Sequence, residues 1–246
     1  MGIGGNSFGN GIEFVSDNYT AKLIFDDDKS YSITTEERIE LGRIREIARK
    51  IPLIRGVLSI FDMGPIIFLV MLLIIVNDLS SSSPLAFSST VSLIVIIVTV
   101  VVFAYVVKKV LLRARDTWKY HGAEHKTLYA YDKGLELTLK NVKDCPRIAR
   151  RCGTNLIVFW LLIFAVGNYF IDYFSLVFLG SYILAYEVLE VDNGDRIPVI
   201  SAFYRLGYLL QQHLFTSEPT DIQLSAAIET LGRLVELEKS VEVAVP

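Results

Sequence analysis

Two of the three histidines in the chain lie four residues apart, in the segment Tyr-His-Gly-Ala-Glu-His-Lys. These are His121 and His125, and Glu124 lies between them. On an α-helix, residues four apart project from the same face, about 6 Å from each other. The order His-x-x-Glu-His is the inverted form of the zinc-protease helix, in which the glutamate activates a metal-bound water. The spacing therefore predicts zinc binding by His121 and His125, with Glu124 as the general base of a hydrolase.

A metal centre also needs a third protein ligand, and two residues are candidates. Cys152 lies in an Arg-Cys-Gly-Thr segment and would bind zinc well as a thiolate. Glu187 lies near the end of a long apolar segment, where a carboxylate is costly unless it is paired or binds a ligand. The alternative for Glu187 is that it reaches toward lipid headgroups. The alternative for the histidines is that they are polar residues facing water near a membrane.

The composition is typical of a membrane protein rather than a soluble one. Apolar residues make up 52% of the 246, mean hydropathy is +0.44, and charged residues are still 21%. Apolar segments of about 20 residues, the length that spans a bilayer, alternate with strongly polar segments. With a net charge of −3, no overall basic excess points to nucleic acid, although local basic clusters exist, and two cysteines do not make a disulfide framework.

These patterns predict a mainly α, polytopic membrane protein with four transmembrane helices, a small N-terminal β-rich cytoplasmic unit and a C-terminal cytoplasmic helix. Strand-like composition over 12–15 and 19–25 indicates the β-rich unit. The expected order is a cytoplasmic β-rich unit (1–35), a basic amphipathic helix (36–56), a first span (57–77), a second span (91–107), a cytoplasmic loop with the histidine and cysteine motifs (108–154), a third span (155–171), a fourth span (173–190), and cytoplasmic interfacial and C-terminal helices (191–246).

The basic residues predict the orientation of these spans. Residues 1–56 hold 8 Lys and Arg, residues 108–154 hold 12 and residues 191–246 hold 4, which accounts for all 24. Because basic residues concentrate on the cytoplasmic side of a membrane, both termini and the central loop are expected in the cytoplasm. Spans three and four are joined by almost nothing, so we expect a tight hairpin that either spans the membrane or is re-entrant.

Several segments, in the same order along the chain, resemble the YqhQ-like family of prokaryotic multi-pass membrane proteins. This family is built on a domain of unknown function and is often described as a predicted metal-dependent enzyme. The similar segments are the glycine-rich start (4–13), Pro-Leu-Ile-Arg-Gly (52–56), the histidine motif (120–142), Arg-Cys-Gly-Thr (151–154), Tyr-Glu (186–187), and Leu-Gln-Gln through Thr-Ser-Glu-Pro-Thr-Asp (210–221). Family members commonly have His-Pro before Arg-Cys-Gly-Thr, where this chain has Ala149 and Arg150. The resemblance implies a protein of the prokaryotic cell membrane.

Three functions remain open from the sequence. The first is a membrane-bound zinc hydrolase whose site lies at the cytoplasmic surface and takes a peptide or lipid-linked substrate. The second is a non-catalytic membrane factor that docks the ribosome or the translocation machinery through the basic residues of 108–151. In that case the histidines and Glu124 would form a structural hub. The third, a transporter, would require a homo-oligomer, since four spans with few charges make a poor pathway.

Overall fold

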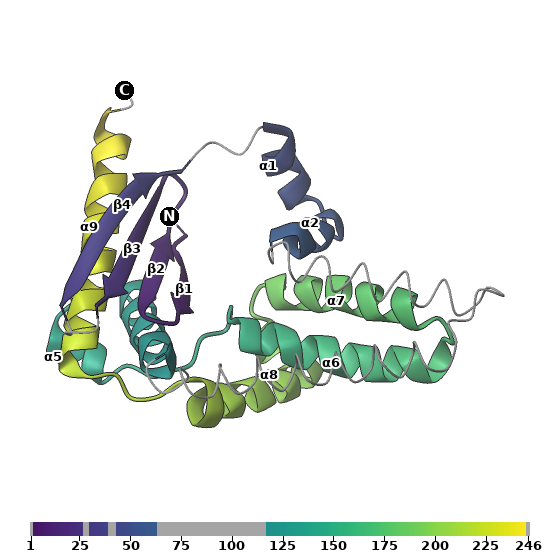
Figure 1. Ribbon diagram of the computed structural model, residues 1–246. Coiled ribbons are helices and arrows are strands. Elements are labelled where there is room, and N and C mark those ends of the chain that lie inside the picture. Colours follow the sequence, from purple (N-terminus) through teal and green to yellow (C-terminus); the bar gives the residue numbers. More distant parts are fainter. Residues whose placement is uncertain (1, 27–29, 39–42, 63–116, 245–246) are drawn as a thin grey trace, which may run out of the picture. The chain divides into compact units, whose positions relative to one another are not determined.

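The computed structural model describes residues 2–26, 30–38, 43–62 and 117–244. The described residues are mostly helical, with an antiparallel four-stranded sheet near the N-terminus (Figure 1). They form two compact units. The first comprises Met1–Glu40, Lys108–Ala149 and Tyr208–Pro246, and the second comprises Leu41–Val107 and Arg150–Gly207. The predicted second span (91–107), and the first span (57–77) beyond residue 62, lie outside the described residues.

The sheet of the first unit confirms the predicted β-rich N-terminal segment. Its strands are β1 (Gly4–Phe8), β2 (Gly11–Val15), β3 (Tyr19–Phe25) and β4 (Tyr31–Glu37), hydrogen-bonded in that order with every neighbour antiparallel. Successive side chains of a strand point to opposite faces of the sheet. The fully or almost fully buried side chains follow this period of two and gather on one face: Ile12, Phe14, Ala21, Leu23 and Phe25.

Helices cover this buried face of the sheet. They are the helix over residues 117–132, here called the histidine helix, and α9 (Asp221–Ala244), which runs along the sheet in Figure 1; the short helix α5 (Leu139–Lys143) packs against α9. One hydrophobic core joins the sheet to these helices. Its members outside the sheet are Tyr120, Ala123, Ala130, Val142, Cys145 (just after α5), Leu224, Ala226, Ala227, Leu231 and Leu234. The α9 helix begins with a capping box, in which Thr220 and Gln223 exchange backbone and side-chain hydrogen bonds.

The far end of α9 holds the turn between β2 and β3. The carboxylate of Glu238 accepts hydrogen bonds from the Ser16 hydroxyl at 2.5 Å and from the backbone and side-chain N–H groups of Asn18, both at 2.8 Å. Glu238 is buried, so these bonds replace the water that its oxygens lose on folding. The helix is thereby tied to the sheet beyond its apolar face.

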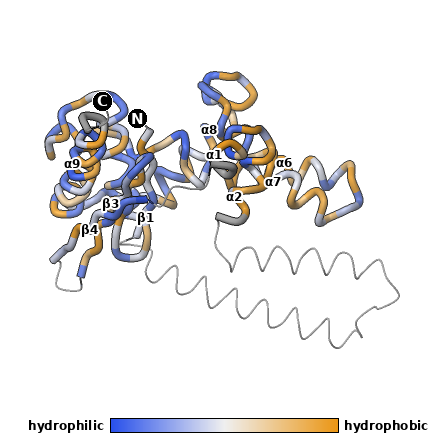
Figure 2. The backbone as a smooth tube through the Cα atoms, turned by 90° about the horizontal axis from the view of Figure 1, so that it is seen from above, coloured by the Kyte–Doolittle hydropathy of each residue, from blue (hydrophilic) through white to orange (hydrophobic). Residues whose placement is uncertain are grey.

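The second unit contains a helical hairpin, α6 (Gly153–Phe170) and α7 (Phe174–Glu190), joined by three residues. The Trp160 indole N–H donates to the Phe178 carbonyl at 3.0 Å, and its ring meets Tyr182 edge-on at 5.4 Å. A short 3-10 turn (Gly194–Arg196) leads to α8 (Pro198–Leu210), whose buried Tyr204 contacts Phe159 of α6. Hydrophobic residues run along both helices of the hairpin (Figure 2).

Of the four predicted spans, the described residues contain one helix that is long and apolar enough to cross a membrane, α6. Only 22% of its residues are buried, and the large apolar side chains of Ile157, Leu161 and Val166 are more than half exposed. The α7 helix, at 17 residues, is of similar composition. A soluble core helix would be mostly buried, which α6 is not.

The predicted basic helix over 36–56 differs from the structure. Strand β4 continues to Glu37, and the helical part is divided into α1 (Arg43–Lys50) and α2 (Ile54–Asp62). Pro52 explains the break, because proline offers no N–H to the helix and disfavours helical geometry in the residue before it. Leu53, with φ at 66°, completes the turn between the two helices.

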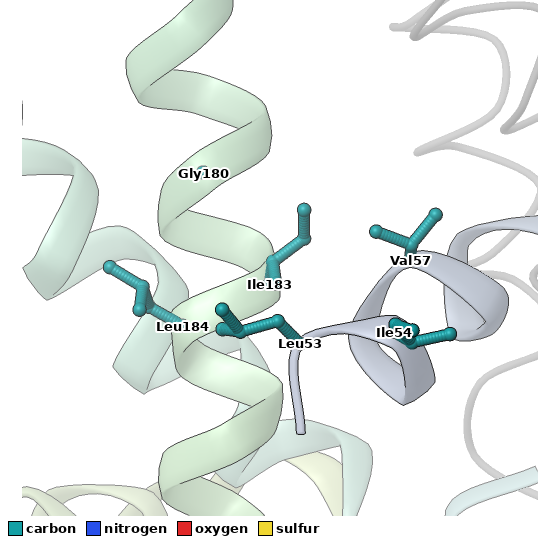
Figure 3. Close-up of a pocket in the computed structure, with 6 residues that line it drawn as sticks. All are labelled: Leu53, Ile54, Val57, Gly180, Ile183 and Leu184. Carbon is teal, nitrogen blue, oxygen red and sulfur yellow. The ribbon is translucent and has the colours of Figure 1, made fainter. Parts of the chain in front are cut away.

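The α2 helix crosses α7 closely in the second unit. A Cβ at Gly56 would lie 3.0 Å from Ile183, so glycine permits the crossing. Beside it, six residues of the two segments line an apolar groove of about 350 Å³: Leu53, Ile54, Val57, Gly180, Ile183 and Leu184 (Figure 3).

Candidate metal centre

The histidine helix is fixed in the first unit by its apolar face. Tyr120, Ala123, Thr127 and Ala130 are buried at helical spacing against the sheet and α9. The Tyr120 ring stacks on Phe25 of β3, with 5.2 Å between the centroids. Because this face is held by the core, the direction in which the histidines project is set by the fold rather than by the histidines themselves.

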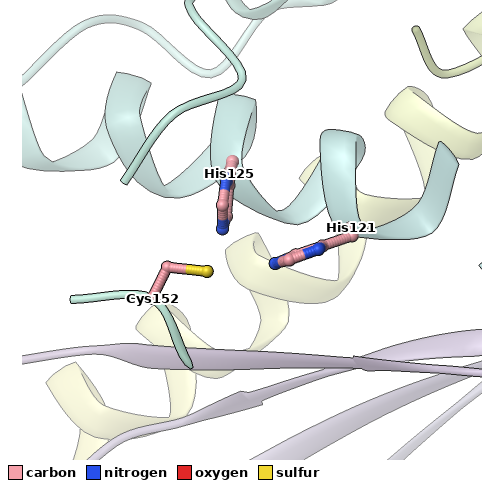
Figure 4. Close-up of side chains that lie close together, drawn as sticks. All are labelled: His121, His125 and Cys152. Atoms are coloured by element: carbon pink, nitrogen blue, oxygen red, sulfur yellow. The ribbon is translucent and has the colours of Figure 1, made fainter. Parts of the chain in front are cut away.

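His121 and His125 project from the same side of the helix on neighbouring turns (Figure 4). Their ring centroids are 4.3 Å apart with an interplanar angle of 66°, and the ring nitrogens that each can offer to a metal lie within 4.8 Å of each other. The sequence-predicted pairing of these two side chains is therefore present. Both residues are largely shielded from solvent, and His125 is only 2% exposed.

The same ring nitrogen is engaged in both histidines. Nδ1 of His121 lies 2.9 Å from the Phe215 carbonyl oxygen, and Nδ1 of His125 lies 2.9 Å from that of Arg147. A carbonyl oxygen only accepts, so Nδ1–H donates in each case and Nε2 carries the lone pair of the neutral ring. Burial lowers the pKa of both rings, that of His125 to about 3. Both are therefore neutral at neutral pH.

Glu124 is buried beside this pair, against strand β1. Its side chain is 5% exposed and packs on Gly5, and Oε2 has no hydrogen-bond partner among the described residues. Burial raises the pKa of Glu124 to about 8, and a hydrogen bond from the Ser7 hydroxyl opposes this shift only in part. A carboxylate in this position would be stabilised by a neighbouring cation.

A short segment before α9, residues 215–218, straps the histidine helix on its outer side. The Ser217 N–H donates to the Trp118 carbonyl at 2.8 Å, and a Cβ at Gly122 would lie 2.2 Å from the Ser217 carbonyl oxygen. The buried ammonium of Lys126 contacts the Glu218 carboxylate at 2.6 Å and donates to the Lys143 carbonyl at 2.6 Å. Gly122 therefore allows the close approach, and Lys126 secures it.

Cys152 lies in the second unit, at the N-cap of α6, and is buried. Ala149, three residues earlier, is bound by both backbone polar groups to the side chain of Gln211.

Glu187, the other predicted third ligand, has a different partner. Its carboxylate forms an ion pair with Arg55 at 2.5 Å and accepts a hydrogen bond from the Leu53 N–H at 2.9 Å. The physical reason for a carboxylate at this place is thus the α2–α7 pairing within the second unit.

Several residues that support the site were not singled out from the sequence. They are Gly5 and Ser7 on β1, Lys126 on the histidine helix, Gln211 before the strap and Glu218 within it. The one available signal was the resemblance of the segments 4–13 and 210–221 to a family pattern, which marks residues without stating their contacts.

The described residues combine two parts in one chain: a sheet-and-helix unit that carries paired, neutral histidines, and a helical hairpin with a long, exposed apolar helix. The architecture is therefore that of a histidine-bearing sheet-and-helix unit combined with an apolar helical hairpin. The comparison with known families identifies the family to which the chain belongs. The chain belongs to the family described as a protein of unknown function (DUF1385), which matches residues 20–237.

A curated relative supports the same assignment. The chain is 35% identical over 138 residues to the uncharacterized protein YqhQ of Bacillus subtilis (strain 168). The match covers 49% of this chain and 41% of that protein, so it spans less than half of the relative's length. No solved structure matches the chain. The resemblance noted in the sequence is therefore confirmed at the level of the family.

Proposed function

We propose that this protein is a multi-pass membrane protein that binds zinc through His121, His125 and Cys152 and acts as a hydrolase at the cytoplasmic membrane surface. The three proposed ligands are labelled in Figure 4. The observation that best supports this proposal is the hydrogen bonding and tautomer of the two histidines. Each donates its Nδ1–H to a backbone carbonyl, which orients the ring and keeps the lone pair on Nε2.

This arrangement is the one that metal-binding histidines adopt. Their second nitrogen almost always donates to a carbonyl, a carboxylate or water, which fixes the tautomer and makes the ring a better ligand. Two histidines one turn apart, both oriented in this way and both neutral, form a preorganised pair. If the histidines were polar residues facing water, which is the alternative from the sequence, neither their burial nor these hydrogen bonds to carbonyl groups would be expected.

Cys152 is the third ligand that we propose, rather than Glu187. Cysteine thiolates are strong zinc ligands, and Cys152 follows Ala149, which is held in the first unit, by three residues. Glu187 is already bound by Arg55 and Leu53, and using it would leave the Arg55 guanidinium without its partner. Breaking a pair of this kind costs more than forming it contributes.

Glu124 is the residue that we propose as the proton acceptor. Zinc, when bound, supplies a water molecule whose pKa is near ~7. Glu124 immediately precedes the ligand His125 and is buried, and its Oε2 has no hydrogen-bond partner among the described residues. A buried carboxyl group held by only one serine hydroxyl can take up and release a proton without breaking a network.

The membrane part of the proposal is supported by exposed apolar helices and by charge. The α6 helix has a mean hydropathy of 1.6 over 18 residues, and only 22% of these residues are buried. Leu161 and Leu176 of the hairpin are 57% and 65% exposed. All 24 Lys and Arg lie outside the predicted spans, on what would be the cytoplasmic side.

A non-catalytic factor that docks the ribosome or the translocation machinery is the competing proposal. The hydrogen bonds of both histidines to backbone carbonyls also suit a structural hub. The basic segment is less well suited to binding RNA phosphates, because Lys126, Lys143 and Arg151 are paired with acidic residues of the same chain. The measurement that separates the two proposals is metal content.

The test is elemental analysis of the full chain, purified in detergent and dialysed against a weak chelator. We expect about one zinc per chain. The double variant His121→Ala/His125→Ala should carry none, while His213→Ala, which alters the third histidine, should retain it. A Glu124→Gln variant should keep the zinc and lose hydrolytic activity. Absence of zinc from the unaltered chain after loading would exclude the hydrolase and leave the docking factor.

A further inference from the structure

Gln211 is a buried residue that is hydrogen-bonded to Ala149, shortly before Cys152, and to Thr216, directly after the turn that contacts His121. We infer that Gln211 is the positioning residue of that centre, fixing the chain that leads to Cys152 relative to the turn that orients His121. The inference rests on the proposed function.

The side chain of Gln211 binds one residue with both of its polar atoms. The Ala149 N–H donates to Oε1 at 2.8 Å, and Nε2 donates to the Ala149 carbonyl at 3.1 Å. This reproduces the pair of bonds that two residues exchange in an antiparallel ladder. Gln211 is 0% exposed, and a buried polar group that loses its partner costs about 1–3 kcal/mol. The clamp therefore holds Ala149 in one place.

The backbone of Gln211 belongs to a π-helical turn, η2 (Gln211–Phe215). The Thr216 N–H and hydroxyl both donate to the Gln211 carbonyl at 2.8 Å, which closes the turn. The last residue of the turn, Phe215, provides the carbonyl that accepts from His121 Nδ1–H. Single π-helical turns are rare in proteins. Those that do occur are often found at functional sites, because the extra residue redirects the backbone.

One residue thus connects two parts of the centre that are distant in sequence. Through its side chain, Gln211 holds Ala149, three residues before Cys152. Through its backbone, it closes the turn that orients His121. Loss of the side chain alone should release the cysteine segment and leave the histidine pair in place, because the His121 and His125 hydrogen bonds do not involve it.

This separation of effects can be measured with cobalt. Co²⁺ takes zinc sites, and its visible absorption reports tetrahedral binding, while a near-ultraviolet charge-transfer band reports a bound thiolate. For the unaltered full chain in detergent, titrated with Co²⁺, we expect both signals. In Gln211→Ala we expect the thiolate band to be lost and cobalt affinity to fall by at least about tenfold, as for other supporting residues of metal sites.

Two further variants make the result specific. Gln212→Ala changes the exposed neighbour in the same turn and should leave both signals unchanged. Gln211→Glu keeps an oxygen for the Ala149 N–H and loses the donor to the Ala149 carbonyl, so its thiolate band should be weakened. If circular dichroism shows that the Gln211→Ala protein is not folded, Gln211→Glu becomes the deciding variant.

The outcomes distinguish the inference from the proposal beneath it. A folded Gln211 variant that binds cobalt with the unaltered thiolate band and affinity overturns the positioning role alone. No cobalt binding by the unaltered chain overturns the proposed function and the inference together. A merely structural role would lower the melting temperature of Gln211→Ala and change the visible and thiolate absorption in equal proportion.

Discussion

Gly5 of strand β1 lies directly against Glu124 of the histidine helix. A Cβ at residue 5 would come within 2.6 Å of Glu124 Oε1 and within 2.8 Å of its Cγ. Glycine at this position is therefore what allows the strand to cover a buried carboxyl group. The contact explains why Gly5 lies in a strand although glycine is a poor strand former.

The first prediction follows from this contact. Gly5→Ala should destabilise the protein by about 1–3 kcal/mol, the usual cost of overpacking, because β1 or Glu124 must move. Gly4→Ala is the matched control, since a Cβ there would lie 4.0 Å from its nearest neighbour. The measurement is thermal unfolding of the two variants beside the unaltered chain. An equal melting temperature for both would contradict the contact.

A second prediction concerns the two candidate third ligands. Cys152→Ser should lower zinc affinity by more than about 100-fold, the upper range for residues outside the metal's own ligands. Glu187→Gln should leave zinc affinity unchanged, because Glu187 binds Arg55. Competition with a zinc-binding dye on both purified variants decides between them. The reverse result, with Glu187→Gln the weaker binder, would restore Glu187 as the ligand.

The third prediction concerns the strap over the histidine helix. Glu218→Gln should destabilise the protein by about 1–3 kcal/mol, because the Lys126 ammonium is 5% exposed and loses its charged partner. In Lys126→Met/Glu218→Gln the second substitution should cost little, since no buried charge remains. Unfolding of the single and double variants, with Glu236→Gln as the control, measures the coupling. If the effects of the two substitutions on the free energy of unfolding are additive, Lys126 and Glu218 are not coupled and the prediction is wrong.

A fourth prediction concerns acid stability. Burial of Glu238 raises its pKa, but hydrogen bonds from Ser16 and Asn18 together outweigh burial and hold the pKa below its ordinary value of 4.5. A depressed pKa in the folded state means that the stabilisation is complete above that value and is lost as the pH falls through the folded pKa. The melting temperature should therefore decrease as the pH is lowered below 4.5.

The matched variant for this pH dependence is Glu238→Gln. It should melt at a lower temperature than the unaltered chain near neutral pH and should show a smaller decrease on acidification. Profiles that stay parallel from neutral to acidic pH would show that Glu238 does not contribute to the acid sensitivity.

Local spacing was sufficient to predict part of this molecule. The four-residue interval between His121 and His125 places both on one helical face, because helix geometry alone decides it. Strands β2 and β3 were predicted from branched and aromatic residues, whereas β1 (Gly-Gly-Asn-Ser-Phe) has almost none. Its strand conformation comes from pairing with β2 and from the Glu124 contact, neither of which is local.

Partners distant in sequence account for the rest. Gln211 and Ala149 are 62 residues apart, and Arg55 and Glu187 are 132 apart. A buried glutamine or an acid in an apolar helix signals that a partner exists but does not identify it. The division of the 36–56 segment is different, because Pro52 was a local signal against a continuous helix.

The first unit is assembled from three stretches of chain, and the last of them is α9, whose Glu238 secures the β2–β3 turn near the other end of the sequence. During synthesis, the sheet and the histidine helix emerge long before the helix that covers them. The apolar face of the sheet is therefore covered by α9 only after residues 208–244 have been synthesised. The hairpin α6–α7 is synthesised before them, after the sheet and the histidine helix. Since domains form as their segments become available, the paired histidines acquire their strap only after residues 215–218 have been synthesised.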